Sequence, residues 1–384
     1  MNYIKLGKIA NVGSGQNAPQ DQKEYCLDGY TFIKASNLDD IISDDNENRA
    51  CKITDEAILN NKLKLIPKKS ILFAKSGLSC IKNRVYLTKD ESYVVNHLCI
   101  LSNINDTYEP QWLAYFIKAF NVTKLIKDES YPSISLTDIK NINVPAISKK
   151  EQQIVTENLN TIKSAIRNKK NELSLLDELV KSRFVEMFET IDLSEEKTEW
   201  VELEKLTKIY TGTTPSSTDE ANWNGDILWI TPAEMNSDSF YIYDTVRKIT
   251  EKGRKSKSLD IMPINTVLLS TRAPIGKVGI VGKPMACNQG FKNFECGPKL
   301  NPVFLYTLLK NNTAYLNSLG SGTTFLEVSK SRIAKLKVPV SDIKLQNQFA
   351  DFVSQVDKSK FVVQQQIKDL QELLDKKMDE YFSE

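Results

Sequence analysis

LSLLDELVKSRFVEMF (residues 173–188) and IKDLQELLDKKMDEYF (residues 367–382) are two similar segments of one 384-residue chain. They share leucines, glutamates and a final phenylalanine at a constant spacing of 194 residues: Leu176/Leu370, Glu178/Glu372, Leu179/Leu373, Glu186/Glu380 and Phe188/Phe382. A period of this length is too long for a solenoid repeat. It indicates that a whole domain with its helix is duplicated.

The duplication extends upstream through both halves of the chain. Val144-Pro145 matches Val338-Pro339 at the same spacing of 194 residues. Pro110 matches Pro302, and Asn96 matches Asn288, at a spacing of 192. Further matches are ILFAKSG (71–77) with VLLSTRA (267–273), FIKASNL (32–38) with WITPAEM (229–235), and IKLGKIANVGSG (4–15) with VELEKLTKIYTG (201–212). Short β-rich runs between Gly, Asn and Ser predict an α+β fold. Each copy is also expected to hold one short amphipathic helix, at 110–120 and 302–312.

A long helix is predicted at the end of each copy. No Gly or Pro interrupts residues 149–197 or 341–384, and each helix of roughly 35–40 residues would be about 55–60 Å long. Apolar residues recur with the 3.5-residue period of a coiled coil. The predicted seam is Leu159, Ile162, Ile166, Leu173, Leu176 and Val180 in the first copy, and Val353, Val356, Val363, Ile367, Leu370 and Leu374 in the second.

One lysine interrupts each seam at a position that is apolar in the other copy. Lys169 corresponds to Val363, and Lys360 corresponds to Ile166. This exchange could favour pairing between the two helices over self-association. Alternatively, both lysines extend along the edge of the seam toward solvent.

The predicted architecture is two related globular domains separated by an antiparallel coiled coil, with a pseudo-two-fold repeat. Its predicted segments are a first domain (1–148), a central spacer helix (149–192), a second domain (198–340) and a C-terminal spacer helix (341–384). Charge alternates along the chain: the net charge is +3 for residues 1–150, −3 for 151–197, +5 for 198–340 and −3 for 341–384. Basic domains favour a polyanion, and acidic spacers would avoid it.

The sequence offers little support for catalysis. The six cysteines form no C-x-x-C pair and there is one histidine, so no metal site is expected and free thiols are predicted. His97 lies in the apolar run VVNHLCIL (94–101) and is interpreted as a core or edge histidine. GSGQNA (13–18) resembles a dinucleotide fingerprint, but loop-like sequence follows it, and a P-loop motif is absent. We expect a cytoplasmic, non-catalytic protein without a secretory signal or a membrane span.

The side chains suited to DNA contact lie in the two basic domains. Arginine reads guanine, Asn and Gln read adenine, and lysines anchor phosphates. The candidates are Lys34, Ser36, Asn37, Lys75, Lys82 and Arg84 in the first domain, and Arg254, Lys255, Lys257, Thr271, Arg272, Lys277, Asn288, Gln289 and Lys292 in the second.

Several stretches carry a resemblance to a known family. VLLSTRAPIGKVGIV (267–281), CNQGF (287–291), SGTTFLEVSKSRIAKLKVPV (321–340) and INVPAISKKEQQIV (142–155) resemble the specificity subunits of type I restriction–modification systems. The first copy departs from this pattern at FAKSGLSCIK (73–82), where the second has STRAPIGK (270–277). The second copy also lacks the acidic residue of KKEQQI at its helix start.

The resemblance implies a non-catalytic subunit that recognises double-stranded DNA. Each target-recognition domain would read one half of a bipartite, asymmetric site, and the helices would space the domains. Two methyltransferase subunits would dock on it and methylate adenine with S-adenosylmethionine. Restriction subunits, using ATP and Mg²⁺, would join the complex. This chain itself would bind no cofactor.

Three alternatives stay open from the sequence. The chain could be a coiled-coil scaffold that does not read DNA, or a silent or phase-variable specificity cassette. It could also be an enzyme with an unrecognised active site, in which case His97→Ala should abolish turnover.

Overall fold

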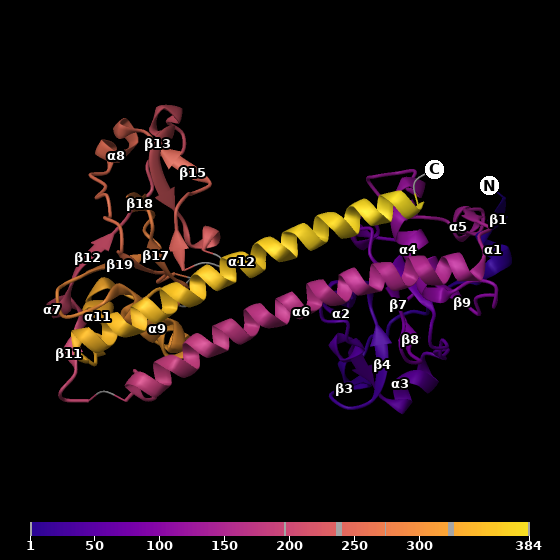
Figure 1. Cartoon of the computed structure of the whole chain (residues 1–384), viewed down its shortest axis with the longest axis horizontal. Coiled ribbons are helices and arrows are strands. Elements are labelled where there is room, and N and C mark those ends of the chain that lie inside the picture. The colour runs from indigo at the N-terminus through magenta and orange to yellow at the C-terminus, as the bar shows by residue number, and fades with distance from the viewer. Residues whose placement is uncertain (1, 196, 236–239, 273, 322–325, 383–384) are drawn as a thin grey trace. The chain divides into compact units, whose positions relative to one another are not determined.

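The computed structural model describes residues 2–195, 197–235, 240–272, 274–321 and 326–382. The chain forms two compact units, unit 1 (Met1–Lys169 with Gln366–Glu384) and unit 2 (Lys170–Gln365). Both mix helices with sheets (Figure 1), so the predicted α+β class is confirmed. Within the described ranges, no helix is long and apolar enough to cross a membrane.

Unit 1 contains two four-stranded sheets, and a two-stranded ribbon pairs the start of the chain with the approach to the long helix. The first sheet has the order β2-β9-β6-β7 and the second β3-β5-β4-β8, with β4 and β8 parallel. The ribbon joins β1 (Tyr3–Lys5) to β10 (Asn143–Pro145). The sheet strands are β2 (Asn11–Ser14), β3 (Tyr25–Cys26), β4 (Tyr30–Ile33), β5 (Cys51–Ile53), β6 (Ile71–Ala74), β7 (Val85–Leu87), β8 (Tyr93–Val94) and β9 (Leu98–Ser102).

Unit 2 repeats this plan with its described strands divided differently, five in the first sheet and three in the second. Its first sheet has the order β12-β19-β16-β17-β14, its second β15-β13-β18, and its ribbon pairs β11 (Val201–Glu202) with β20 (Lys337–Val338). The parallel pair is β13 with β18. The sheet strands are β12 (Thr207–Thr211), β13 (Trp223–Ile230), β14 (Tyr241–Ile242), β15 (Arg247–Ile249), β16 (Val267–Leu269), β17 (Val278–Val281), β18 (Met285–Cys287) and β19 (Lys292–Cys296).

The short helices also occur in matched pairs. Helices α4 (Pro110–Phe120) and α9 (Pro302–Asn311) both begin with proline in the first turn, where its missing N–H is tolerated. Both were predicted, within one residue of their observed bounds. Helices α5 (Leu136–Lys140) and α11 (Lys330–Ala334) are capped by the hydroxyls of Ser135 and Ser329. The remaining helices include α1 (Leu6–Ile9), α2 (Leu38–Asp44), α3 (Asp55–Asn60), α7 (Leu203–Leu206), α8 (Glu251–Ser256) and α10 (Thr313–Ser318).

The two long helices are α6 (Lys149–Phe188) and α12 (Ile343–Phe382). Helix α6 starts in a capping box, in which Ser148 N–H donates to the Glu151 carboxylate and Glu151 N–H donates to Ser148 Oγ. At the start of α12, Asp342 accepts from Lys344 N–H instead, which compensates for the missing acidic residue. Each helix contributes residues to both units.

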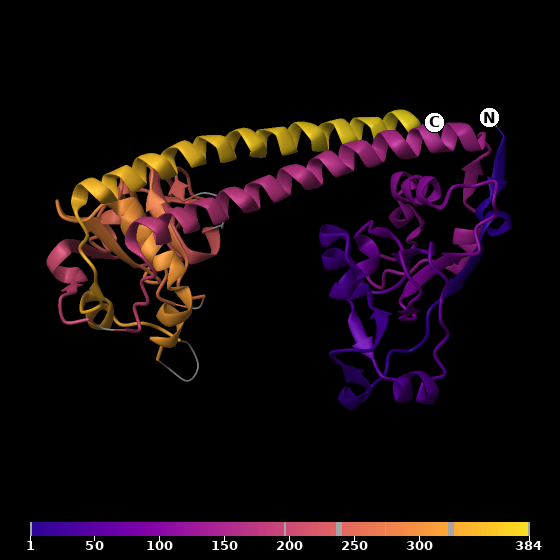
Figure 2. The ribbon, with the colours of Figure 1, turned by 60° about the horizontal axis from the view of Figure 1, so that its bottom comes forward.

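In unit 2, the second half of α6 runs antiparallel to the first half of α12 (Figures 1 and 2). Phe184 packs against Phe349 with ring centroids 5.3 Å apart, and Asp177 pairs with Lys360 further along. The residue numbers of the contact partners therefore fall along α6 as they rise along α12, which is the pattern of an antiparallel pair. Phe188 packs on Phe304 of α9 at 4.8 Å and closes the end of this pair.

Unit 1 holds the matching contact at the end of α12. Phe382 packs against Trp112 and Phe116 of α4, with centroids 5.8 and 6.2 Å apart. Asn158 of α6 donates a hydrogen bond of 2.9 Å to the Tyr381 hydroxyl. The long helix of each sequence copy therefore ends in the unit that holds the globular domain of the other copy.

The predicted seam residues of both helices are buried or half-buried, with Leu159, Val353 and Val363 among the buried ones. Lys360 is also half-buried at the seam and forms its ion pair with Asp177 of the partner helix. This pair supports the hypothesis that the charged seam position favours pairing between α6 and α12.

A buried glutamine joins each long helix to the loop before the short helix of the same unit. The Gln152 side chain accepts from Glu109 N–H at 2.8 Å and donates to the carbonyls of Thr107 and Ile147. In unit 2, Gln346 makes the same three bonds to Asn301, Lys299 and Ser341. Both side chains are 0% exposed, and we call them the glutamine clamps.

Candidate nucleic-acid interface

The ends of three strands meet at one edge of unit 1. Val95 N–H donates to Ile33 O at 3.0 Å, which joins the turn after β8 to the end of β4. Lys75, just after β6, donates from its N–H to His97 O at 2.9 Å and accepts from Ile134 N–H at 2.8 Å. We call residues 33–37, 75–76, 95–97 and 133–134 loop cluster 1.

The same bonds recur in unit 2. Asn288 N–H donates to Ile230 O at 3.1 Å. Thr271 donates from its N–H to Gly290 O at 2.7 Å and accepts from Val328 N–H at 2.9 Å. Residues 230–231, 271–272, 288–290 and 327–328 are called loop cluster 2. The backbone arrangement of this edge is therefore common to both units, although the side chains differ.

This register corrects one of the sequence matches. Because Val95 and Asn288 make equivalent backbone bonds, Asn96 corresponds to Gln289 and not to Asn288. The match at a spacing of 192 rested on residue identity, whereas the strand pairing sets a spacing of 193. The spacing of 192 still holds for the proline pair at the starts of α4 and α9.

Two equivalent glycines allow the loops to lie this close. A Cβ atom on Gly15 would lie 2.0 Å from Val94 O, and one on Gly212 would lie 1.9 Å from Cys287 O. Gly15 is therefore explained by close backbone packing. The next helical turn after GSGQNA, at Gln22–Glu24, is a separate 3₁₀ turn. The geometry does not match a phosphate-binding strand–turn–helix.

Four of the six candidates in the first domain lie in loop cluster 1. Ser36 is exposed, and Lys34, Asn37 and Lys75 are half-buried. Lys34 Nζ lies 4.1 Å from the centre of the Tyr25 ring, and Asn37 Oδ1 accepts from Lys34 N–H. These side chains come from two loops that the backbone bonds hold together.

Lys82 and Arg84 differ from the other four because both pair with a carboxylate of α2. Lys82 Nζ lies 3.3 Å and Arg84 Nη1 2.8 Å from Asp39 Oδ2, and these cations lower the pKa of Asp39 against the opposing effect of desolvation. Arg84 is only 9% exposed. A structural ion pair therefore explains Arg84 better than a base contact.

Of the two positions predicted for His97, the core position is wrong, and the histidine lies at the edge of unit 1 that holds loop cluster 1. His97 is exposed in the turn between β8 and β9, and its Nδ1 lies 2.8 Å from Ser76 Oγ. Its apolar neighbours belong to the flanking strands β8 and β9. The sequence therefore looks like one continuous apolar run and does not indicate the turn between them. Among the described residues, no carboxylate bonds to His97, so the pair lacks the third member of a hydrolytic triad.

Six candidates of the second domain lie in or beside loop cluster 2. Arg272 and Gln289 are exposed, Lys277 and Asn288 are half-buried, and Thr271 and Lys292 are buried. Lys277 Nζ donates to Pro232 O at 3.0 Å, and Gln289 accepts from the Thr214 hydroxyl at 2.7 Å. Within the motifs that carried the resemblance, Ala273 and residues 322–325 lie outside the described residues.

The remaining three candidates lie on or just after α8. Arg254 donates to both carboxylate oxygens of Glu251, at 2.9 and 2.6 Å, and Lys255 Nζ lies 3.8 Å from the same carboxylate. Lys257, directly after α8, is exposed. Helix α8 packs against β13 and β15, so these residues belong to a separate part of unit 2.

Sequence reasoning missed Glu327. Its carboxylate accepts from Arg272 Nε at 2.9 Å, and its other oxygen lies 3.7 Å from Lys292 Nζ. An acidic residue was not expected in a DNA interface, and the chain offers no local signal that brings positions 272 and 327 together. Burial lowers the pKa of Lys292, partly offset by Glu327.

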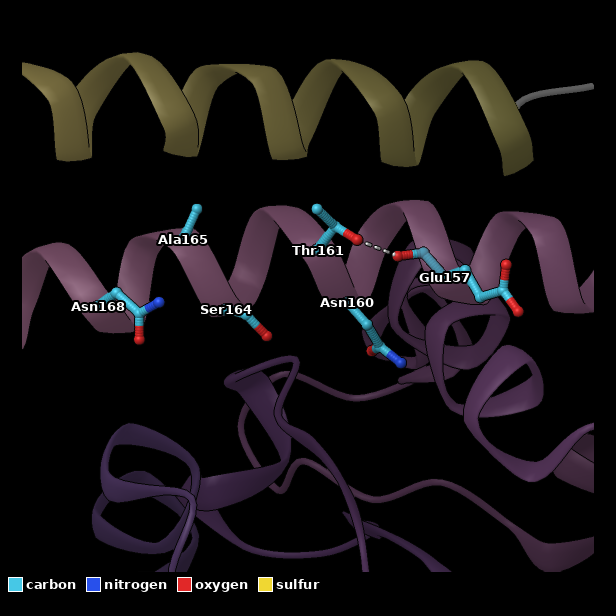
Figure 3. Close-up of a pocket in the computed structure, with 6 residues that line it drawn as sticks. All are labelled: Glu157, Asn160, Thr161, Ser164, Ala165 and Asn168. Atoms are coloured by element: carbon cyan, nitrogen blue, oxygen red, sulfur yellow. Dashed lines mark hydrogen bonds between the residues drawn. The ribbon is translucent and has the colours of Figure 1, made fainter.

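The structure also contains an open groove along α6 in unit 1, with a volume of 580 Å³ (Figure 3). Its lining is Glu157, Asn160, Thr161, Ser164, Ala165 and Asn168, so it holds one carboxylate and no second titratable side chain. The described residues form no cluster of three metal-ligating side chains. The six cysteines are free, and burial raises the pKa of Cys99 and Cys287 to about 12.

Two copies of one α+β plan, each followed by a long helix, define the class of this protein, and comparison with known proteins identifies its family. The sequence pattern of the type I restriction modification DNA specificity domain matches residues 1–176 and again residues 195–372. The chain belongs to this family.

Curated relatives and solved structures extend the comparison. The chain is 35% identical over 184 residues to the type I restriction enzyme MjaIX specificity subunit of Methanocaldococcus jannaschii, covering 47% of this chain and 43% of that protein. It is 33% identical over 94 residues to the EcoprrI specificity subunit of Escherichia coli, covering 24% and 23%. The chain thus spans less than half the length of either relative.

Two solved structures share the fold. The S subunit of a type I system from M. genitalium aligns with 100% of this chain and 96% of its own, at a TM-score of 0.56 and 13% identity. A chain from a study of type I complex assembly and conformational transition aligns with 99% of this chain and 97% of its own, at a TM-score of 0.59 and 18% identity.

Proposed function

We propose that this chain is the non-catalytic specificity subunit of a type I restriction–modification complex, and that each loop cluster reads one half of a bipartite DNA site. The observation that carries the proposal is the common backbone of the two loop clusters with different side chains on each. A backbone arrangement that both units share, with different side chains on each, suits two domains that recognise different half-sites.

The proposal extends to partners and cofactors. Double-stranded DNA would contact the loop clusters, and two methyltransferase subunits would dock on the long helices, with restriction subunits joining the complex. S-adenosylmethionine would be held by the methyltransferase, and ATP and Mg²⁺ by the restriction subunit. A subunit that works on chromosomal DNA of a prokaryotic host would act in the cytoplasm.

Exchanging residues 1–148 for the corresponding domain of another specificity subunit should change one half-site and leave the other intact. The reason is that loop cluster 1 lies wholly within the exchanged segment, whereas loop cluster 2 does not. The measurement is the methylated sequence in genomic DNA of a host that expresses the chimera with its methyltransferase. A change in both half-sites would contradict the two-reader proposal.

The scaffold alternative makes a different prediction for the same complex. Selection from a randomised duplex library should enrich one bipartite sequence if the chain reads DNA. Lack of enrichment with the methyltransferase partners present would favour a scaffold. If the purified complex enriches a bipartite sequence but that sequence is not methylated in the host genome, the result would instead indicate a silent cassette.

The long helices carry exposed apolar residues that suit a docking surface. In unit 2 the most exposed of these are Phe361 and Val362 of α12 and Leu175 and Leu179 of α6, with Phe361 70% exposed. Large exposed apolar side chains often mark protein contacts. We propose that methyltransferase subunits cover them.

The double variant Phe361→Ser/Val362→Ser should weaken methyltransferase binding by about tenfold or more, because burying one phenylalanine contributes about 1.5–3 kcal/mol. Affinity would be measured by titrating labelled specificity subunit with methyltransferase. Lys358→Ser, an exposed position one turn earlier, is the matched control. Undiminished assembly of the double variant would rule out this surface.

A further inference from the structure

Arg272, Glu327 and Lys292 form a charged cluster at the exposed edge of unit 2. Glu327 bridges the two cations, accepting from Arg272 Nε at 2.9 Å and lying 3.7 Å from Lys292 Nζ. The side chains are 44%, 37% and 8% exposed for Arg272, Glu327 and Lys292. The cluster thus has a buried lysine at its base and an arginine facing solvent.

The backbone holds this cluster in place. Arg272 and Glu327 form a β-bridge, and Val328 N–H donates to Thr271 O at 2.9 Å on the same pair of segments. Lys292 Nζ also donates to Thr271 Oγ1 at 3.4 Å. Two adjacent segments and a buried side chain therefore restrict the position of the Glu327 carboxylate.

The contact to Nε leaves the terminal nitrogens of Arg272 as the donors at its exposed end. Among the described residues, no hydrogen bond occupies these two nitrogens. Two parallel N–H donors are the group that grips guanine O6 and N7 in the major groove. A carboxylate behind Nε would hold the guanidinium plane fixed, so less side-chain freedom is lost on binding.

Unit 1 has the same frame without the charges. Ser76 and Ser133 form the equivalent β-bridge, and the strand register places Cys99 at the position of Lys292. Ser76 Oγ contacts His97 Nδ1 instead. Three charged residues in unit 2 thus correspond to three neutral ones in unit 1, while the backbone bonds are retained.

We infer that Arg272 reads one guanine of the second half-site and that Glu327, supported by Lys292, is the positioning residue that sets its specificity. This inference rests on the proposed function. Removing Glu327 leaves an arginine that still attracts phosphate but is no longer held in the plane of the base. Specificity should therefore fall while affinity for unrelated DNA is kept or increased.

The test is library selection and direct titration of the assembled methyltransferase complex with wild-type and variant chains. Arg272→Ala should lower cognate affinity by about 5- to 150-fold and remove the preference at one base pair of the second half-site. Glu327→Ala should remove the same preference without lowering affinity for non-cognate duplexes. Glu327→Gln, which retains an oxygen for Arg272 Nε, should restore the base preference.

Two controls separate this inference from a general effect. Lys283→Ala removes one exposed positive charge from the turn between β17 and β18 and should leave the selected sequence unchanged. Melting temperatures of the variants show whether Glu327 contributes only to stability. In that case the selected preference would weaken at all base pairs of the site together. That outcome would overturn the positioning role.

The outcomes also distinguish this inference from the proposed function. If the wild-type complex selects no bipartite sequence, the proposed function fails. If it selects one, but Arg272→Ala and Glu327→Ala select the same sequence as wild type, the inference alone is overturned. A change confined to the first half-site would overturn it as well.

Discussion

Replacing Phe184 with alanine is expected to lower the free energy of unfolding of unit 2 by about 3–5 kcal/mol. Phe184 is 2% exposed and packs against Phe188, Phe304 and Phe349, with ring centroids 5.1–5.4 Å apart. The side chain fills the junction of α6, α9 and α12, and rigid rings on three sides cannot close the resulting cavity.

Hydrogen exchange measured by mass spectrometry would locate the loss, since a chain with two units need not unfold in one step. Faster exchange is expected in α9 and in residues 343–365, with little change in the sheets of unit 1. Val185→Ala is the matched control: Val185 is 38% exposed, so its effect should stay within about 0.5 kcal/mol. Equal losses from the two variants would contradict the packing argument.

Replacing either glutamine clamp with leucine is expected to destabilise its own unit by about 3 kcal/mol. Leucine keeps the volume but leaves one backbone N–H and two carbonyls without their partner, and an unsatisfied buried group costs about 1–3 kcal/mol. Gln152→Leu should act on unit 1, where Glu109 loses its acceptor, and Gln346→Leu on unit 2, where Asn301 does.

Denaturant unfolding followed by local hydrogen exchange would measure both variants. The exposed neighbours Gln153 and Gln348 provide matched controls, because leucine there removes no buried bond. If Gln152→Leu proved as harmless as Gln153→Leu, the clamp would have no energetic role in unit 1.

The sequence was most informative where the signal was periodic or repeated. The heptad pattern and the absence of Gly and Pro predicted α6 and α12, and proline with apolar residues predicted α4 and α9. These elements depend on local propensity and on one buried face. The α+β class was predicted from the short β-rich runs between Gly, Asn and Ser, and the family from the resemblance of residues 267–281, 287–291, 321–340 and 142–155.

The candidate interface was less predictable because it depends on which loops meet. Arg84 looked like any surface arginine until its pairing with Asp39 was visible, and His97 looked buried because its neighbours are. Glu327 lies 55 residues from Arg272, and a β-bridge brings the two together. Contacts of this kind are set by tertiary structure, whereas composition gives only the residue types.

Because the long helix of each copy ends in the unit of the other copy, the two units are completed in an unusual order during synthesis. Unit 1 includes Gln366–Glu384, so Phe382 reaches Trp112 only after nearly the whole chain has been translated. Unit 2 is continuous from Lys170 to Gln365 and can be completed earlier. Although domains generally fold from the N-terminus during synthesis, here the first unit to emerge is the last to be finished. A truncation that removed only the final turns of α12 would therefore damage the opposite end of the sequence.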